Sequence, residues 1–192
     1  MHVVEPVVRV GVVVTFLRMD RPPADPAPAF PPGVGVRQAV NCSVELYRHL
    51  YNTVGADYVW WLRRTLSDRQ LAALLRDPQI SIHVLERPGD NGGETLGFYE
   101  LDRNPWPVVN LSYFGLMPQA VGKHLGHAFL RHAVDTAWRM GPRAVTVNTC
   151  TADHPRALPN YQRVGFRRLR DVPEDWHVPL RLGMTIPDHL KL

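Results

Sequence analysis

The chain has 192 residues, of which 45% are hydrophobic and 21% are charged, and its formal net charge is +4 at pH 7. These values predict one globular domain spanning residues 1–192 and exclude a wholly disordered chain. No apolar run is long enough to cross a bilayer, and the first ten residues lack the basic start and the cleavage site of a secretory signal. We therefore expect a cytoplasmic protein that does not contact a membrane.

The basic residues and the cysteines narrow the function only slightly. Nearly all the basic residues are arginine, and no arginine run is interleaved with aromatic residues, so we expect no nucleic-acid partner. A basic nucleic-acid binder nevertheless stays open as a hypothesis. A mildly basic surface also suits a polyanionic cofactor. Cys42 and Cys150 lie far apart without a CxxC partner, which predicts neither a disulfide framework nor a zinc cluster and leaves a nucleophilic cysteine open.

The N-terminal half of the chain alternates strand-like and helix-like patterns. Valine-rich segments predict strands, proline removes amide donors and predicts an exposed loop, and the Ser67–Gln70 spacing is a capping box that begins a helix. In chain order we expect a strand at 6–18, a proline-rich loop at 21–35, helices at 43–55 and 67–77, a hairpin of strands 80–86 and 95–101 with its turn at 87–93, and a strand at 108–116.

The C-terminal half predicts a crossover between strands. We expect a helix from Val121 to Gly141, a strand at 143–149, a short helix at 153–164, and one or two closing strands within 166–184, of which 178–184 is the better candidate. This order indicates an α/β (α+β) chain. Its central sheet is mixed and mostly antiparallel, helices flank it, and its later part contains a βαβ crossover.

The sequence VGKHLG at 121–126 opens the long helix directly after the strand at 108–116. Amides at a helix start have no intrahelical partner, and the helix dipole places partial positive charge there. Gly122 and Gly126 allow a ligand to approach the backbone, so a pyrophosphate could bind these amides. Taken alone, a simple turn with close packing explains two glycines equally well.

The sequence DHPRALPNYQRVGF at 153–166 is the second informative segment. Ala157 and Tyr161 lie four residues apart, on one face of the expected helix, and Gly165-Phe166 turns the chain into the next strand. A lone tyrosine in this position is more often an ordinary core or surface aromatic.

Together, the two segments resemble the GNAT superfamily of N-acetyltransferases, in which VGKHLGHAFL would occupy the pyrophosphate motif and ALPNYQRVGF the tyrosine-bearing helix. The resemblance covers about residues 80–185, and YFGLMP and TCTADHP are similar to a bacterial branch of unassigned substrate. It implies a GNAT-like fold with the βαβ crossover at the cofactor site, and acetyl-CoA as co-substrate without a metal. Val121 and His124 depart from the motif, which usually has Gln or Arg and then Gly there. The resemblance assigns cofactor binding to Gly115, Leu116, Met117, Val121, Gly122, Lys123, His124, Leu125, Gly126, His127, His154 and Asn160.

The resemblance also implies a mechanism. Tyr161 would give a proton to the departing sulfur, and a backbone N–H near Gly115 or Leu116 would polarise the thioester oxygen. Glu100 is the carboxylate candidate for the general base, with a solvated strand-end charge as its equally weighted alternative. Tyr113 and His154 are further candidates for the base.

We therefore expect transfer of an acetyl group from acetyl-CoA to a primary amine of a small molecule or a peptide. The alternative is a non-catalytic module that binds an acyl-CoA as a sensor. A homodimer is among the assemblies that the resemblance allows. The aromatic residues within 47–61 lie where GNAT enzymes build the acceptor pocket. They suit either a core or a wall for a flat or cationic acceptor. A metal site at His124, His127 and His132 is unattractive, because that helix start already serves the phosphate loop.

Overall fold

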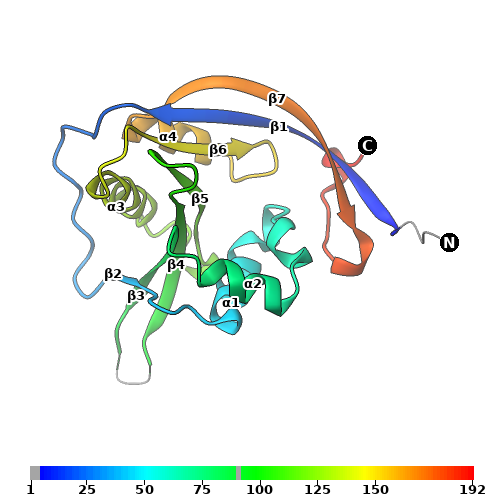
Figure 1. Cartoon of the computed structure of the whole chain (residues 1–192), viewed down its shortest axis with the longest axis horizontal. Coiled ribbons are helices and arrows are strands. Elements are labelled where there is room, and N and C mark those ends of the chain that lie inside the picture. The colour runs from blue at the N-terminus through cyan, green and yellow to red at the C-terminus, as the bar shows by residue number, and fades with distance from the viewer. Residues whose placement is uncertain (1–4, 90–91) are drawn as a thin grey trace.

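The computed structural model describes residues 5–89 and 92–192 and contains a seven-stranded sheet in the order β2-β3-β4-β5-β6-β1-β7 (Figure 1). Neighbouring strands are antiparallel except β5 and β6, which are parallel and joined through α3. The expected mixed sheet and its βαβ crossover are thus confirmed. The strands are β1 (Val7–Met19), β2 (Gly35–Gln38), β3 (Ile80–Arg87), β4 (Glu94–Asp102), β5 (Val108–Leu116), β6 (Ala144–Cys150) and β7 (Arg167–Pro179).

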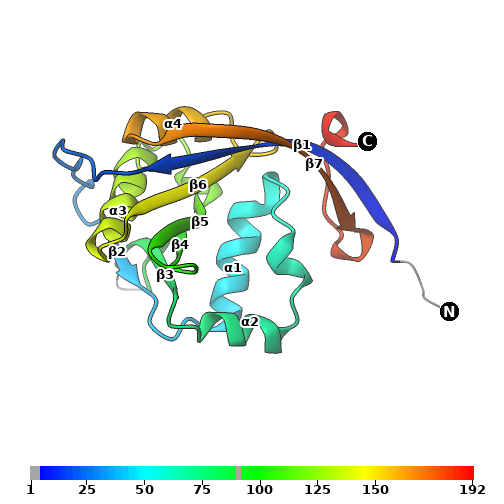
Figure 2. The ribbon, with the colours of Figure 1, turned by 45° about the horizontal axis from the view of Figure 1, so that its top comes forward.

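Helices cover both faces of the sheet (Figure 2). They are α1 (Val44–Val54), α2 (Asp68–Leu75), α3 (Gly126–Arg139) and α4 (Ala157–Val164). The side chain of Ser43 caps α1, and Ser67 and Gln70 form the expected capping box of α2. Gly165 ends α4 with φ 116°, in the left-handed region that glycine tolerates best.

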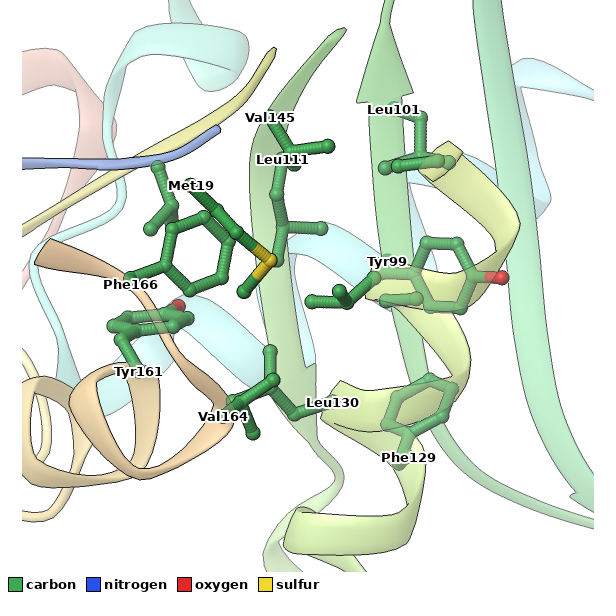
Figure 3. Packing of buried hydrophobic residues seen from close by; sticks show 14 of the residues in the cluster. Met19, Tyr99, Leu101, Leu111, Phe129, Leu130, Val145, Tyr161, Val164 and Phe166 are labelled. Atoms are coloured by element: carbon green, nitrogen blue, oxygen red, sulfur yellow. The ribbon is translucent and has the colours of Figure 1, made fainter. Parts of the chain in front are cut away.

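Two apolar cores lie on opposite faces of the sheet. One joins the sheet to α3 and α4, and Figure 3 shows Leu111, Phe129 and Tyr161 among its members. The other joins α1 and α2 to β3 and β4 through residues such as Tyr47 and Phe98. The sheet therefore lies between two layers of helices, because each of its apolar faces is buried against one pair of helices.

A third cluster lies along a two-stranded arm made by β1 and β7. β6 pairs only with Val14–Met19 of β1, whereas β7 follows β1 from Val7 to Arg18. Figures 1 and 2 both show the two strands continuing side by side beyond the rest of the sheet. Val59 and Ile186 help to bury the inner side of this arm.

One element was missed, and two expectations about the elements are wrong. The missed element is the short edge strand β2, which follows the proline-rich loop. A closing strand lies within 166–184 as expected, but it is 167–179 and not the preferred 178–184: β7 pairs with β1 as far as Pro179, and residues 180–182 then form a 3-10 turn. The long helix begins at Gly126 and not at Val121, because Gly122 and His124 adopt positive φ, which no α-helix accommodates.

Some expectations fall partly outside the described residues. The turn expected at 87–93 includes residues 90–91, and the segment tested for a secretory signal includes residues 1–4. Within the described ranges, none of the helices combines the length and the apolar composition that crossing a membrane requires.

Candidate active site

The parallel strands β5 and β6 separate part of the way along their length. Val108–Leu111 pair with Ala144–Val147, and beyond these residues the two strands no longer pair with each other. A cavity of about 1100 Å³ is lined by residues 110–116 of β5 and by Asn148 and Cys150 of β6. Because a strand alternates the direction of its backbone groups, some amides of β5 face this opening and are available to a ligand.

A β-bulge at Ser112 re-aims the side chains of β5 at this cavity. Glu100 of β4 pairs with Tyr113 and Leu101 pairs with Leu111, so Ser112 is an extra residue in the ladder. Leu111 packs into the core beneath α3, whereas Tyr113 packs beside α1 on the opposite face. Without the extra residue the two side chains would share a face, since strands alternate with period two.

The loop before α3 presents backbone amides to the cavity. Gly122 has φ 82° and His124 has φ 58°, and α3 begins after Leu125 without any side-chain cap. Amides in the first turn of a helix lack intrahelical acceptors, and here Gly126 and His127 line the cavity. The uncapped start of a 14-residue helix is thus a site suited to an anion.

Cationic and imidazole side chains line the cavity into which this helix start opens. They are His124, His127, Arg156 and Arg163. Burial, with smaller effects from the nearby charges of Arg163 and Arg131, lowers the pKa of His127. Its Nδ1 is buried and has no hydrogen-bond partner within the described part of the chain. The unpaired amides of the helix start and the side chains of Arg156 and Arg163 supply the hydrogen-bond donors and the positive charge that a phosphate group requires, so the residues present fit the diphosphate of an acyl-CoA.

Tyr161 of α4 lies between the cavity and the core. Its ring centroid is 6.4 Å from that of Phe114 and 6.0 Å from that of Phe166, and Figure 3 shows it beside Phe166. Burial raises the pKa of its hydroxyl above the usual value for tyrosine, and the negative charge of Asp153 raises it further. The phenol therefore stays protonated at neutral pH and can act as a proton donor.

The cavity also has aromatic walls. The backbone conformation around residues 55–59 allows Trp60 to form part of them. A Cβ atom at Gly55 would lie 2.4 Å from the Cβ of Trp60, so only glycine fits beneath the indole. Val59 adopts φ 55°, which is strained for a β-branched residue and is maintained only by its surroundings. Of the predicted aromatic group, Tyr47 and Tyr51 are buried, and Tyr51 also lines the cavity. The wall is formed by Tyr58, Trp60, Trp61, Tyr113 and Trp176.

Asp153 and Glu174 are the acidic residues that line the cavity. Asp153 Oδ2 accepts hydrogen bonds from the Thr149 hydroxyl at 2.8 Å and from the Cys150 amide at 2.9 Å. Its Oδ1 lies 3.4 Å from the indole nitrogen of Trp60. Glu174 accepts a hydrogen bond of 2.7 Å from the indole of Trp176, its neighbour on β7.

The position of Glu100 fits neither of the two interpretations of the sequence, a general base at the cavity and a solvated charge at a strand end. Glu100 is fully buried, with 0% of its surface exposed, so the alternative of a solvated charge is wrong. Its Oε1 accepts a hydrogen bond of 2.6 Å from Arg63, and its Oε2 accepts one from the hydroxyl of Tyr47. Glu100 does not line the cavity, whereas Arg63 does and lies over the ring of Tyr113. This carboxylate therefore fixes Arg63 and Tyr47.

Most of the residues expected to bind the cofactor line one cavity, together with Tyr161, the expected proton donor. Those cofactor residues are Gly115, Leu116, Val121, Gly122, His124, Leu125, Gly126, His127, His154 and Asn160. Met117 is buried beside α1, and Lys123 is exposed outside the lining. Sequence reasoning missed Asp153, Glu174 and Trp176. The signal that could have revealed the last two is the two-residue period of the sequence at 172–178, which places Glu174 on the same face as Val172, Trp176 and Val178.

Comparisons with known proteins agree with this geometry. Residues 46–166 match the model of the acetyltransferase (GNAT) family. A GCN5-related N-acetyltransferase from Sphaerobacter thermophilus has 19% identity and a TM-score of 0.58 over 91% of this chain and 53% of its own. A tandem GNAT protein of the clavulanic acid biosynthesis pathway has 17% identity and a TM-score of 0.62 over 91% and 55%. An aminoglycoside acetyltransferase from an uncultured soil metagenomic sample, solved with sisomicin, has 11% identity and a TM-score of 0.55 over 69% and 88%.

These structures share the fold at low identity, and the chain spans about half the length of the first two. No curated protein matches it. The family model nevertheless covers well over half of the chain, including β5, α3, β6 and α4, which build the cavity. The separated strands, the uncapped helix start and the tyrosine of α4 thus lie within the matched segment, and the chain belongs to the GNAT family of acetyltransferases.

Proposed function

We propose that the protein transfers an acetyl group from acetyl-CoA to a primary amine of a small molecule or peptide. The observation that carries the proposal is that one cavity joins the uncapped start of α3, the open edge of β5 and the protonated Tyr161. When bound there, acetyl-CoA would supply an activated thioester. The aminoglycoside acetyltransferase among the similar folds is consistent with an amine acceptor.

The chain offers a separate group for each part of the cofactor. The amides of Gly126 and His127, with Arg163 beside them, would hold the diphosphate through charge and hydrogen bonds. A backbone N–H near Gly115 or Leu116 would polarise the thioester oxygen. His154 and Asn160 line the cavity near Tyr161 and would position the pantetheine arm.

The proton transfers require one acid and one base. Tyr161 holds a proton at its hydroxyl and would give it to the departing sulfur. An alkyl ammonium has a pKa of about 10.4 and must lose a proton before it attacks. We assign this step to Asp153 in place of Glu100, because Asp153 lines the cavity and its charge acts on Tyr161, whereas Glu100 does not line the cavity and forms an ion pair with Arg63.

The test compares Tyr161→Phe with the unchanged protein, measuring thiol release over a panel of amines and acetyl-CoA binding by calorimetry. Losing the acid should lower kcat by about 10²-fold or more while the dissociation constant stays within a few-fold. His124→Gly serves as the control for the cofactor loop. It relieves a positive φ and leaves the amides in place, so binding should be retained. Equal turnover by Tyr161→Phe would remove Tyr161 from the mechanism.

The strained His124 also favours a second candidate, a module that binds an acyl-CoA without catalysis. A non-glycine residue with positive φ stores strain in the loop, which a protein retained only for binding would tolerate. Tight binding of acetyl-CoA without thiol release on any amine of the panel would support this module and would contradict the enzyme.

A further inference from the structure

We propose that the acceptor is a small di- or polyamine, in which a second cationic nitrogen lies a few bonds from the nitrogen that is acetylated. This inference rests on the proposed function and names the substrate class of the same cavity. Its first support is the position of the charged side chains that line the cavity. Arg163 lies near His127 of α3, whereas Asp153 and Glu174 contact the aromatic wall at the indoles of Trp60 and Trp176.

Neither of these carboxylates is neutralised by the protein. Within residues 5–89 and 92–192, the donors to Asp153 are a hydroxyl, a backbone amide and an indole, and the donor to Glu174 is an indole. Other acids of the chain do have cationic partners: Glu100 pairs with Arg63, and Asp175 pairs with Arg9. Within the described residues, neither of the two carboxylates that line the cavity forms an ion pair with a basic side chain of the protein.

A partly buried carboxylate without a cation is costly, because burial removes part of its hydration. Both Asp153 and Glu174 are partly buried, and they come from different elements, the turn after β6 and the strand β7. An acceptor with one ammonium group would compensate only one of them. An acceptor with two cationic nitrogens would place the reacting nitrogen at Asp153, beside Tyr161, and the other at Glu174.

The aromatic walls that contact the two carboxylates suit cations as well. Trp60, Trp61, Tyr113 and Trp176 line the cavity, and the faces of such rings attract ammonium groups. Tyr113 already has the guanidinium of Arg63 5.3 Å from its ring centre. That guanidinium is bonded to the buried Glu100, so it adds no net charge to oppose a second cation.

The decisive comparison uses 1,4-diaminobutane and pentylamine as acceptors, with thiol release as the readout. The two molecules have equal numbers of non-hydrogen atoms and differ in a terminal ammonium against a terminal methyl group. We expect kcat/KM for the diamine to exceed that for pentylamine by about tenfold or more. This factor corresponds to the free energy that one hydrogen bond between charged groups contributes. 2-Phenylethylamine tests whether the aromatic walls instead select a flat body.

Glu174→Gln locates the second charge on the protein. Glutamine keeps an oxygen for the indole of Trp176 and removes only the negative charge. The ratio of kcat/KM for the diamine to that for pentylamine should fall by about tenfold. The matched control is Asp175→Asn, the adjacent residue of β7, which is exposed, pairs with Arg9 and does not line the cavity. Its preference should equal that of the unchanged protein.

The outcomes separate this inference from the proposed function. Binding of both amines to the protein is also measured by calorimetry, which needs no turnover. No thiol release with any amine, together with preferential binding of the diamine, would refute the acetyltransferase and keep the dicationic ligand. Equal use of pentylamine, a preference for 2-phenylethylamine, or equal losses on both amines in Glu174→Gln would overturn the dicationic acceptor.

Discussion

The buried ion pair between Glu100 and Arg63 yields the sharpest prediction about stability. Glu100 is 0% exposed and Arg63 is 21% exposed, and the two are joined at 2.6 Å. Replacing Arg63 with methionine keeps an apolar stem but leaves a buried carboxylate with only Tyr47 as a donor. Breaking such a pair costs about 3–5 kcal/mol. For a chain of this size the melting temperature should fall by about 6–20 °C, measured by circular dichroism.

Two control variants test whether the loss of stability comes from the unpaired buried charge. Arg37→Met breaks the exposed pair with Glu86 and should change the unfolding free energy by at most about 1 kcal/mol. Adding Glu100→Gln to Arg63→Met removes the unpaired charge and should recover part of the lost stability, so the double-mutant cycle is non-additive. A melting temperature of Arg63→Met within about 2 °C of the unchanged protein would refute the reasoning.

Three further changes test other parts of the structure. In Gly115→Ala the new Cβ would lie 2.3 Å from Val54, so overpacking should lower the free energy of unfolding, measured in urea, by about 1–3 kcal/mol. Gly126→Ala should not show this loss, because the atom nearest to its new Cβ is 3.8 Å away. Ser67→Ala removes the capping box of α2 and should cost about 1 kcal/mol in the same assay. Burial and the nearby charge of Asp153 raise the pKa of Cys150 to about 12, so iodoacetamide should label it at pH 8 only after unfolding. Rapid labelling of the folded protein, or unchanged stability of Gly115→Ala or Ser67→Ala, would contradict the corresponding argument.

Local signals in the sequence predicted the parts of the fold that depend on local interactions. The capping box at Ser67 and Gln70 and the glycine that ends α4 act within a single turn of chain, and both are present where expected. The same holds for the crossover from β5 through α3 to β6, because alternation gives way to helical periodicity within a short stretch.

Features set by distant partners could not be predicted in this way. β7 is polar on its outer side, and its length is set by the register with β1, from Val7 opposite Pro179 onward. β2 is a four-residue strand whose only neighbour in the sheet is β3. Short strands carry too few residues for a periodicity to be recognised.

The residues of the candidate site show the same difference between local features, which the sequence predicts, and features that depend on distant partners. The backbone around 121–126 and Tyr161 were found because each lies in a contiguous segment. Glu100 looked like an accessible charge because its partner Arg63 is distant in sequence, and the burial of a charge depends on such a partner. Glu174 reaches the cavity only through the pairing of β7 with β1.

The pairing of the first strand with the last also sets the order in which the sheet can form during synthesis. Both neighbours of β1 come late, since β6 begins at Ala144 and β7 at Arg167. At ordinary elongation rates β1 therefore waits on the order of ten seconds without a partner. During that time its valine-rich edges are exposed, and such edges are prone to pair with other chains. Completion of the sheet, and with it the wall that carries Glu174, is thus a late event that depends on contacts between residues far apart in the sequence.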